Sequence, residues 1–115
     1  MATTQECRAA LDTLSDTMAG ADGEVRAAAA LDRTLSCHVT DLDVTFSGRL
    51  ADGRIEVLAT RPGPPAEKAQ IRLAMTGDDL VALVRGRLNF AKAWAAGRIR
   101  LEASFRDLLR LRTLL

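Results

Sequence analysis

The chain contains little of several residue types on which enzymes and membrane proteins depend. Its 115 residues include no tyrosine, one histidine and two cysteines, and its aromatic side chains are three phenylalanines and one tryptophan. The lack of tyrosine excludes catalysis that needs a phenol. No stretch approaches the ~20 consecutive apolar residues of a membrane-spanning helix. Residues 1–16 lack the basic start and unbroken apolar segment of a secretory signal. We therefore expect a cytoplasmic protein.

A strong excess of charge of one sign is also absent. Sixteen basic and fifteen acidic side chains give a net charge of +1, which argues against a nucleic-acid partner. Basic residues nevertheless gather late in the chain. Residues 85–115 hold eight basic and two acidic side chains, whereas residues 1–84 hold eight basic and thirteen acidic ones. This excess either attracts an anionic group or coats the solvent-facing sides of short elements, and the sequence leaves both open.

The overall composition is that of one globular domain. Apolar residues make up 48% of the chain and charged residues 27%, and a chain of this length forms a single domain, here residues 1–115. Arginine outnumbers lysine 14 to 2, and alanine occurs 20 times. This bias is typical of a GC-rich, bacterial genome and carries no functional signal.

Residues for catalysis or metal binding do not form a recognisable set. His38 follows Cys37 on an expected strand, so the two side chains face opposite sides of the sheet. One histidine and two distant cysteines, Cys7 and Cys37, do not supply a zinc site. We predict no catalytic residue, no metal and no cofactor, and two buried, unpaired cysteines.

Helical spacing and capping signals predict helices near both ends of the chain. Thr3 and Glu6 form a capping-box pattern, and apolar residues then recur every three or four positions. Similar capping patterns pair Thr76 with Asp79, and Ser104 with Asp107. The expected helices run from Thr3 to Gly20, Asp22 to Arg33, Thr76 to Gly86, Asn89 to Gly97 and Ser104 to Leu115.

Between these helices the apolar period changes from helical spacing to two, which indicates strands. The expected strands cover residues 35–40, 42–47, 54–60, 69–76 and 98–103. Asp41 suggests a tight turn, and Asp52-Gly53 is a hairpin signal. We expect residues 61–65, which contain three prolines, to form an exposed loop. Helices segregated from a run of strands predict an α+β domain whose sheet has one covered and one wet face.

Four short motifs follow one another in the C-terminal third. A strand end enters a capped helix, a glycine–basic–aliphatic step follows, a second helix carries aromatic residues, and a second such step begins a strand. The residues are Met75–Leu80, Leu83–Leu88, Phe90 with Ala93 and Trp94, and Gly97–Leu101. With this pattern, the segment from Met75 to Leu115 resembles the sterol carrier protein 2 type of lipid-binding domain. The upstream helices and hairpin fit the same order of elements.

The resemblance implies a five-stranded, mostly antiparallel sheet covered by helices on one face. It also implies an apolar tunnel between the sheet and the C-terminal helices, for a fatty acyl chain, an acyl-CoA, a sterol-like molecule or an isoprenoid lipid. The residues that would line it are Phe46, Val57, Leu73, Leu83, Phe90, Trp94, Leu101, Phe105 and Leu109. The arginines that would meet a carboxylate or phosphate at its mouth are Arg85, Arg87, Arg98 and Arg100.

The residue pattern alone does not separate a hollow core from a solid one, because ligand sites and cores are both mostly apolar. The leading interpretation is a small carrier of an apolar ligand, compatible with transient membrane contact and with a homodimer. The alternative is a non-catalytic accessory or protein-interaction module of the same fold with a filled core.

Overall fold

The computed structural model describes residues 2–19, 32–51 and 54–111, and the structural statements below concern these parts of the chain. Helices and strands follow one another as expected for an α+β domain. Their bounds are α1 (Thr4–Ala19), β1 (Arg33–Val39), β2 (Val44–Ala51), β3 (Arg54–Pro62), β4 (Ile71–Met75), α3 (Gly77–Val84), α4 (Phe90–Ala95), β5 (Arg100–Glu102) and α5 (Phe105–Leu111).

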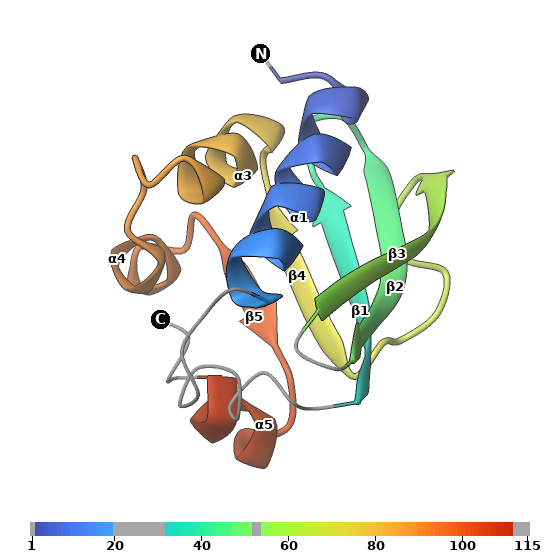
Figure 1. Cartoon of the computed structure of the whole chain (residues 1–115), viewed down its shortest axis with the longest axis vertical. Coiled ribbons are helices and arrows are strands. Elements are labelled where there is room, and N and C mark those ends of the chain that lie inside the picture. Colours follow the sequence, from blue (N-terminus) through green and yellow to red (C-terminus); the bar gives the residue numbers. More distant parts are fainter. Residues whose placement is uncertain (1, 20–31, 52–53, 112–115) are drawn as a thin grey trace.

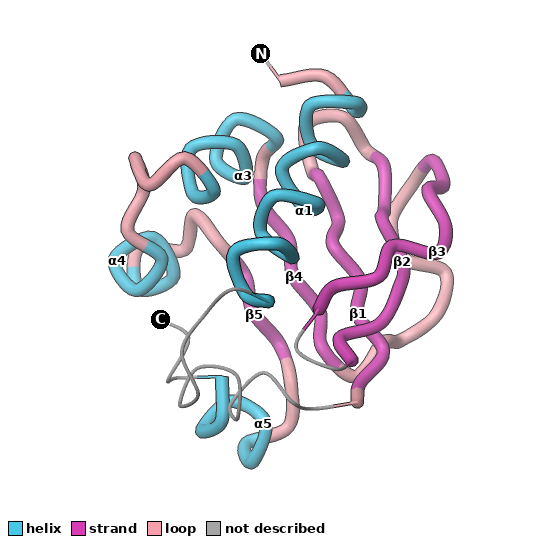
Figure 2. The backbone as a smooth tube through the Cα atoms, in the orientation of Figure 1, coloured by secondary structure: helices cyan, strands magenta, loops and turns pink. Residues whose placement is uncertain are grey.

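The five strands form one sheet in the order β3-β2-β1-β4-β5, as Figures 1 and 2 show. Three neighbouring pairs are antiparallel, whereas the central pair of β1 and β4 is parallel, with Leu35 beside Ile71 and Val39 beside Met75. A parallel pair needs a long connection. Here that connection consists of β2, β3 and the loop after β3. The prediction of a mostly antiparallel five-stranded sheet is confirmed.

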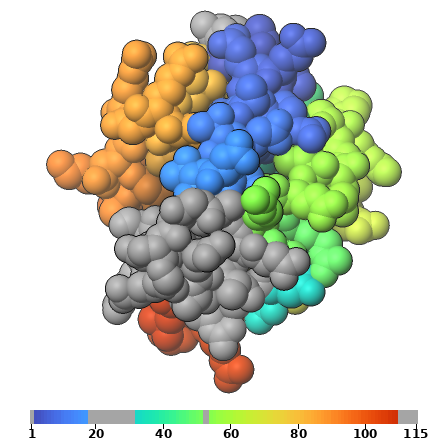
Figure 3. All heavy atoms as spheres, viewed as in Figure 1, coloured from blue at the N-terminus to red at the C-terminus, as the bar shows by residue number. Residues whose placement is uncertain are grey.

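The helices lie over one face of this sheet, called the inner face here, and α1 crosses its centre (Figures 1 and 2). Space-filling atoms show α1 wedged between α3 on one side and β3 on the other (Figure 3). Alternation along β1 turns Leu35, Cys37 and Val39 toward the helices, and all three are buried. The opposite, outer face carries the polar residues of the same strands, as the period of two predicts.

Apolar packing on the inner face divides into two clusters. The larger cluster joins α1 and α3 to the upper parts of the strands, and it includes Cys7, Leu11, Phe46, Leu80 and Ile99. The smaller cluster consists of Leu35, Leu50 and Ile71, with Ile55, Leu73, Leu101 and Ala103 packed against them. Leu73 touches both clusters.

The capping signals are confirmed wherever the structure describes them. Thr3 and Glu6 exchange two hydrogen bonds of 3.1 Å between side chain and backbone. The hydroxyl of Thr76 accepts a bond from the amide of Asp79, and the side chain of Asn89 caps α4 in the same way. The hydroxyl of Ser104 accepts from the amide of Asp107 at 3.2 Å. Each signal depends on residues three apart, so local sequence suffices to find it.

Several predicted element bounds are wrong. Arg33 begins β1 instead of ending a helix, while residues 22–31 of that predicted helix lie outside the described residues. Strand β2 begins at Val44 and not at Leu42, because residues 40–43 form a turn in which Asp43 adopts a positive φ of 49°. Strands β4 and β5 are shorter than expected because their ends bond to loops and helices rather than to a neighbouring strand.

The predicted proline loop is also partly wrong, because Arg61 and Pro62 belong to β3. Pro62 lies opposite Val44 at the end of the strand. Strand β3 is an edge of the sheet, where a residue without an amide hydrogen is tolerated. The exposed loop therefore begins at Gly63. The hairpin residues 52 and 53 lie outside the described part, but the pairing of Ala51 with Arg54 agrees with the predicted hairpin.

Candidate ligand-binding site

The smaller apolar cluster is the part of the inner face that the described helices do not fill. Its members come from the strands and from Ala103, and none of the described helix residues belongs to it. Leu73 of β4 and Leu101 of β5 are direct neighbours in the sheet. Both are half-buried and lie on the inner face. They form an apolar floor at the β5 side of the sheet.

Helix α5 follows β5 and carries apolar side chains that are exposed instead of packed in the core. Phe105 is 77% exposed and Leu109 is 51% exposed. Residues four positions apart share one face of a helix, so the two side chains form one apolar patch on α5. Such a patch on a short helix indicates a surface that a further apolar molecule can cover.

An ion pair fixes the orientation of α5. The buried carboxylate of Asp107 accepts a hydrogen bond from Nε of Arg33 at 3.0 Å. Asp107 lies midway between Phe105 and Leu109 in sequence, which places it about half a helical turn from both. Because Asp107 points to the start of β1, Phe105 and Leu109 point elsewhere. A charge on the inward side of α5 thus leaves its apolar side uncovered.

The nine residues predicted to line a tunnel fall into three groups. Phe46 is buried in the larger cluster, and Val57, Leu83 and Phe90 pack against it. Leu73 and Leu101 lie together at the smaller cluster. Trp94, Phe105 and Leu109 are exposed, although the Trp94 ring also packs on Phe90 with ring centroids 6.3 Å apart. The structure therefore brings together Leu73 with Leu101, Phe105 with Leu109, and Phe90 with Trp94.

The four predicted headgroup arginines do not converge. Arg85 and Arg87 border a cavity of about 240 Å³ between α1 and α3 that also contacts Glu6 and Asp78. Arg98 donates to the carboxylate of Asp79 at 2.5 Å, and this carboxylate is almost buried at the start of α3. Arg100 lies opposite Ala74 on the outer face of the sheet. The Arg98–Asp79 pair ties α3 to the segment before β5, which is a structural role.

Cysteine and histidine side chains lie in two different environments, the core and the outer face of the sheet. The cysteines Cys7 and Cys37 are buried and unpaired, as predicted. Burial raises the pKa of the Cys37 thiol to about 12. Burial, assisted by nearby carboxylates of which Asp41 is the strongest, raises the pKa of Cys7 to about 11. The Nε2 atom of His38 lies 3.0 Å from Oδ1 of Asp43, on the face of the sheet opposite to Cys37.

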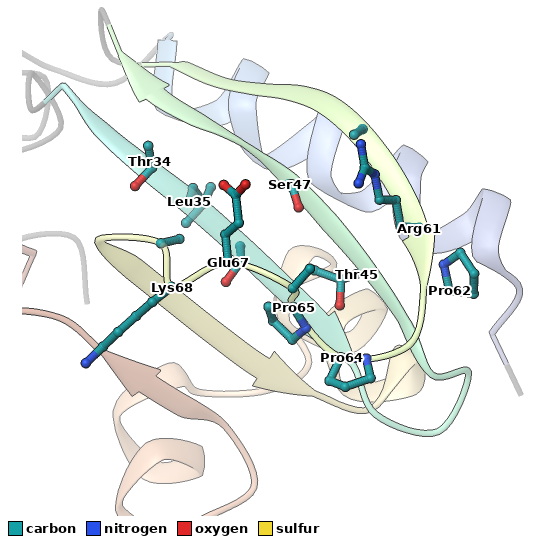
Figure 4. A pocket seen from close by; sticks show the side chains of 14 residues that line it. Thr34, Leu35, Thr45, Ser47, Arg61, Pro62, Pro64, Pro65, Glu67 and Lys68 are labelled. Carbon is teal, nitrogen blue, oxygen red and sulfur yellow. The ribbon is translucent and has the colours of Figure 1, made fainter.

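The outer face of the sheet holds a cavity that the sequence pattern does not predict. It measures about 300 Å³ and lies where the loop after β3 crosses β1 and β2 (Figure 4). Its floor holds the hydroxyl side chains Thr34, Ser36, Thr45 and Ser47. The available signal was the run of small hydroxyl residues on alternate positions of two neighbouring strands. Their common neighbour, the proline loop, is distant in sequence and could not be placed from the pattern.

Within the described parts of the chain, no group of three or more histidine, cysteine, aspartate or glutamate side chains could hold a metal ion. None of the described helices has the length and apolar content to cross a membrane.

The sequence from residue 11 to residue 115 matches the model of the SCP-2 sterol transfer family. The chain belongs to this family. It is thus a lipid-binding or lipid-transfer domain of the sterol carrier protein 2 type, and the sequence resemblance is confirmed. No curated protein sequence matches the chain.

Solved structures share the fold at low sequence identity. The sterol carrier protein domain 2 of Helicoverpa armigera superposes with a TM-score of 0.68 at 17% identity, over 98% of this chain and 89% of that one. The palmitated SCP2L2 of Aedes aegypti gives 0.58 at 11% identity, over 98% and 94%. The sec-alkylsulfatase Pisa1 from Pseudomonas sp. gives 0.55 at 23% identity, covering 90% of this chain but 16% of the sulfatase. At these identities the structures establish the shared fold.

Proposed function

We propose that the protein is a non-catalytic carrier of a single-chain apolar ligand, of the fatty acyl type, in the cytoplasm of a bacterium. The ligand covers the apolar patch of α5 and extends from there to the floor formed by Leu73 and Leu101. The observation that carries the proposal is the exposure of Phe105 and Leu109 on the helix that follows β5, in a chain of a lipid-binding family. The solved structure of palmitated SCP2L2 from Aedes aegypti, which shares the fold, supports the same ligand class.

The energy of such binding comes from removing apolar surface from water. Burying ~250 Å² of ligand surface at ~25 cal/mol per Å² gives roughly 6 kcal/mol before the cost of association. This magnitude is compatible with micromolar affinity once contacts from the protein side are added. The four arginines lie in three separate places, so we expect affinity to follow chain length more than headgroup charge.

The available nucleophiles support a role without catalysis. Both thiols have raised pKa values and are buried, so little reactive thiolate forms at neutral pH. The histidine is on the outer face, and its Nε2 is paired with Asp43. Neither group is placed at the α5 patch. A carrier needs only binding and release, which an apolar surface on a short terminal helix supplies.

The decisive experiment is binding of palmitate and hexadecanol to the purified protein and to the Phe105→Ala variant. Trp94 is the one tryptophan and lies on α4, so its fluorescence reports a ligand that reaches α4, and native mass spectrometry detects a bound ligand independently of its position. We expect both ligands to bind the parent protein with similar micromolar affinity, and Phe105→Ala to weaken both about ten-fold, as expected for losing 1–2 kcal/mol of buried ring contact.

The matched control is Leu58→Ala, because Leu58 is also a large exposed apolar side chain, at 62%, but lies on β3. It should bind as the parent does. If neither ligand binds the parent protein in fluorescence titration or native mass spectrometry, the carrier proposal fails. The alternative, an accessory module whose apolar patch contacts another protein, would then take its place.

A further inference from the structure

The outer-face cavity has the features of a built polar site that the lipid-binding function does not use. It lies on the side of the sheet opposite to the helices and to the α5 patch. Strands β1 and β2 form its floor, the end of β3 one wall, and residues 64–69 its cover (Figure 4). A volume of about 300 Å³ is at the small end of the range for ligand pockets.

One hydroxyl in this floor lacks a hydrogen-bond partner. Ser36 is 2% exposed, and its Oγ makes no hydrogen bond with any of the described residues. Two neighbouring hydroxyls do have hydrogen-bond partners. Thr34 Oγ1 accepts a hydrogen bond from the amide of Gln70, and Thr45 Oγ1 donates one to the carbonyl of Gly63. A buried polar atom without a partner is costly and calls for an explanation. A polar ligand entering the cavity would supply the missing bond.

Two opposite charges face the same space. In Figure 4 the Glu67 carboxylate lies above β1 near Ser47, and the Arg61 side chain projects from β3, whereas Lys68 points away. Glu67 and Arg61 line the cavity but form no ion pair with each other or with any other residue in the part of the chain that the structure describes. Two such groups on either side of a row of hydroxyls suit a molecule that carries both charges.

The cover of the cavity is attached at its ends. Gly63 bonds to Asp43 and Thr45 at one end, and Ala69 and Gln70 bond to Arg72 and Thr34 at the other. Residues 64–68 between them make no hydrogen bond to any residue that the structure describes. This part of the loop can therefore shift to admit a ligand without breaking these bonds. Pro64 and Pro65 have no amide hydrogen, but the amides of residues 66–68 can bind an anionic group.

We propose that this cavity binds a small zwitterion, a molecule with an ammonium group close to a carboxylate or phosphate. Glu67 receives the ammonium group, Arg61 receives the anionic group, and Ser36 hydrogen-bonds to the ligand in the floor. Free amino acids and the phosphoethanolamine headgroup share this chemistry. The site is separated by the sheet from the proposed acyl site, so each can be present without the other.

The test is a titration of the labelled protein followed by the backbone amide signals in nuclear magnetic resonance. The probes are glycine and phosphoethanolamine, with ethanolamine and inorganic phosphate as probes of one charge. We expect at least one zwitterion to shift amides in residues 34–36, 45–47 and 61–69, with millimolar affinity. Binding of glycine alone assigns the site to free amino acids, and binding of phosphoethanolamine alone assigns it to a lipid headgroup.

Three variants separate a specific site from general charge effects. Glu67→Gln should weaken zwitterion binding about ten-fold, as expected for loss of a charged hydrogen bond, and Ser36→Ala should weaken it about five-fold. Asp16→Asn removes an exposed carboxylate from α1, on the other side of the sheet, and should change nothing. The proposal is overturned if neither zwitterion shifts these amides, if ethanolamine or phosphate alone binds equally well, or if Glu67→Gln binds unchanged.

Discussion

Cys7 and Cys37 illustrate how burial changes the chemistry of a single side chain. Both belong to the larger core cluster and are at most 1% exposed. Folding keeps their thiols protonated, because the thiolate would lose its hydration in the core. Sequence alone predicted the burial from the compartment and the alternation pattern. It could not predict the carboxylates near Cys7, since Asp41 and Asp78 reach it from distant segments.

The raised thiol pKa values predict a loss of stability at alkaline pH. The unfolded thiols titrate near 9 and the folded ones near 11 and 12. The stabilisation is complete below pH 9 and is lost as the pH rises toward the folded values. Between these limits each thiol should lower the free energy of unfolding by about 1.4 kcal/mol per pH unit.

Denaturant unfolding between pH 8 and pH 11 measures this loss. Few other side chains titrate in this pH range, because the chain has no tyrosine and only two lysines, Lys68 and Lys92, both exposed. The Cys7→Ala variant should show a shallower pH dependence than the parent. A free energy of unfolding that stays constant up to pH 11 would show that the thiols remain hydrated in the folded protein.

At the scale of elements, the sequence predicted what local interactions determine. The helix starts at Thr3, Thr76, Asn89 and Ser104 are confirmed because each depends on a side chain and an amide three residues apart. The parallel pairing of β1 with β4 was not predicted, because it joins segments 36 positions apart. For the candidate site, alternation placed Leu73 and Leu101 on the inner face, but it could not show that Asp107 turns Phe105 outward.

The irregular pairing of β2 with β3 was equally absent from the pattern. The register shifts between Ser47 and Gly48, and this bulge brings the strands very close at Gly48. An ideal Cβ built on Gly48 would lie 1.8 Å from the carbonyl oxygen of Glu56, which is a backbone atom. The bulge therefore requires glycine at position 48, which pairs with Val57, and Leu58 is the unpaired, exposed residue of the bulge.

Gly48→Ala should lower the free energy of unfolding by at least ~2 kcal/mol, because the strands must separate to admit the methyl group. The control is Gly86→Ala. Gly86 has a φ of 74° and no atom within 4 Å of an added Cβ, so it should cost only about 1 kcal/mol for the backbone conformation. Chemical denaturation of both variants decides the matter, and equal losses would argue against the close approach.

At the scale of the whole molecule, the sheet separates two faces of different chemistry. Its inner face is apolar and supports the proposed acyl site, whereas its outer face carries hydroxyl and charged residues under the proline loop. A ligand on the inner face would complete the packing of the smaller cluster and α5. Stability and ligand binding are then coupled, because the unfolded chain has no such site.

Palmitate at 100 times its dissociation constant should raise the free energy of unfolding by about 2.7 kcal/mol. Thermal unfolding followed by circular dichroism, with and without the ligand, measures the effect. In Phe105→Ala the same palmitate concentration should give a smaller rise, and in Leu58→Ala the full rise. A midpoint that palmitate leaves unchanged in the parent protein would contradict the coupling.

Strand β3 also determines how the chain behaves beside other copies of itself. An edge strand presents free amide and carbonyl groups onto which another sheet can grow, the first step toward fibrils. In β3 the bulge at Gly48 adds twist, Pro62 lacks an amide hydrogen, and Arg54 and Glu56 place charges along the strand. These irregularities make the edge a poor template for aggregation. A protein with an exposed apolar helix face can thereby stay dispersed at high concentration.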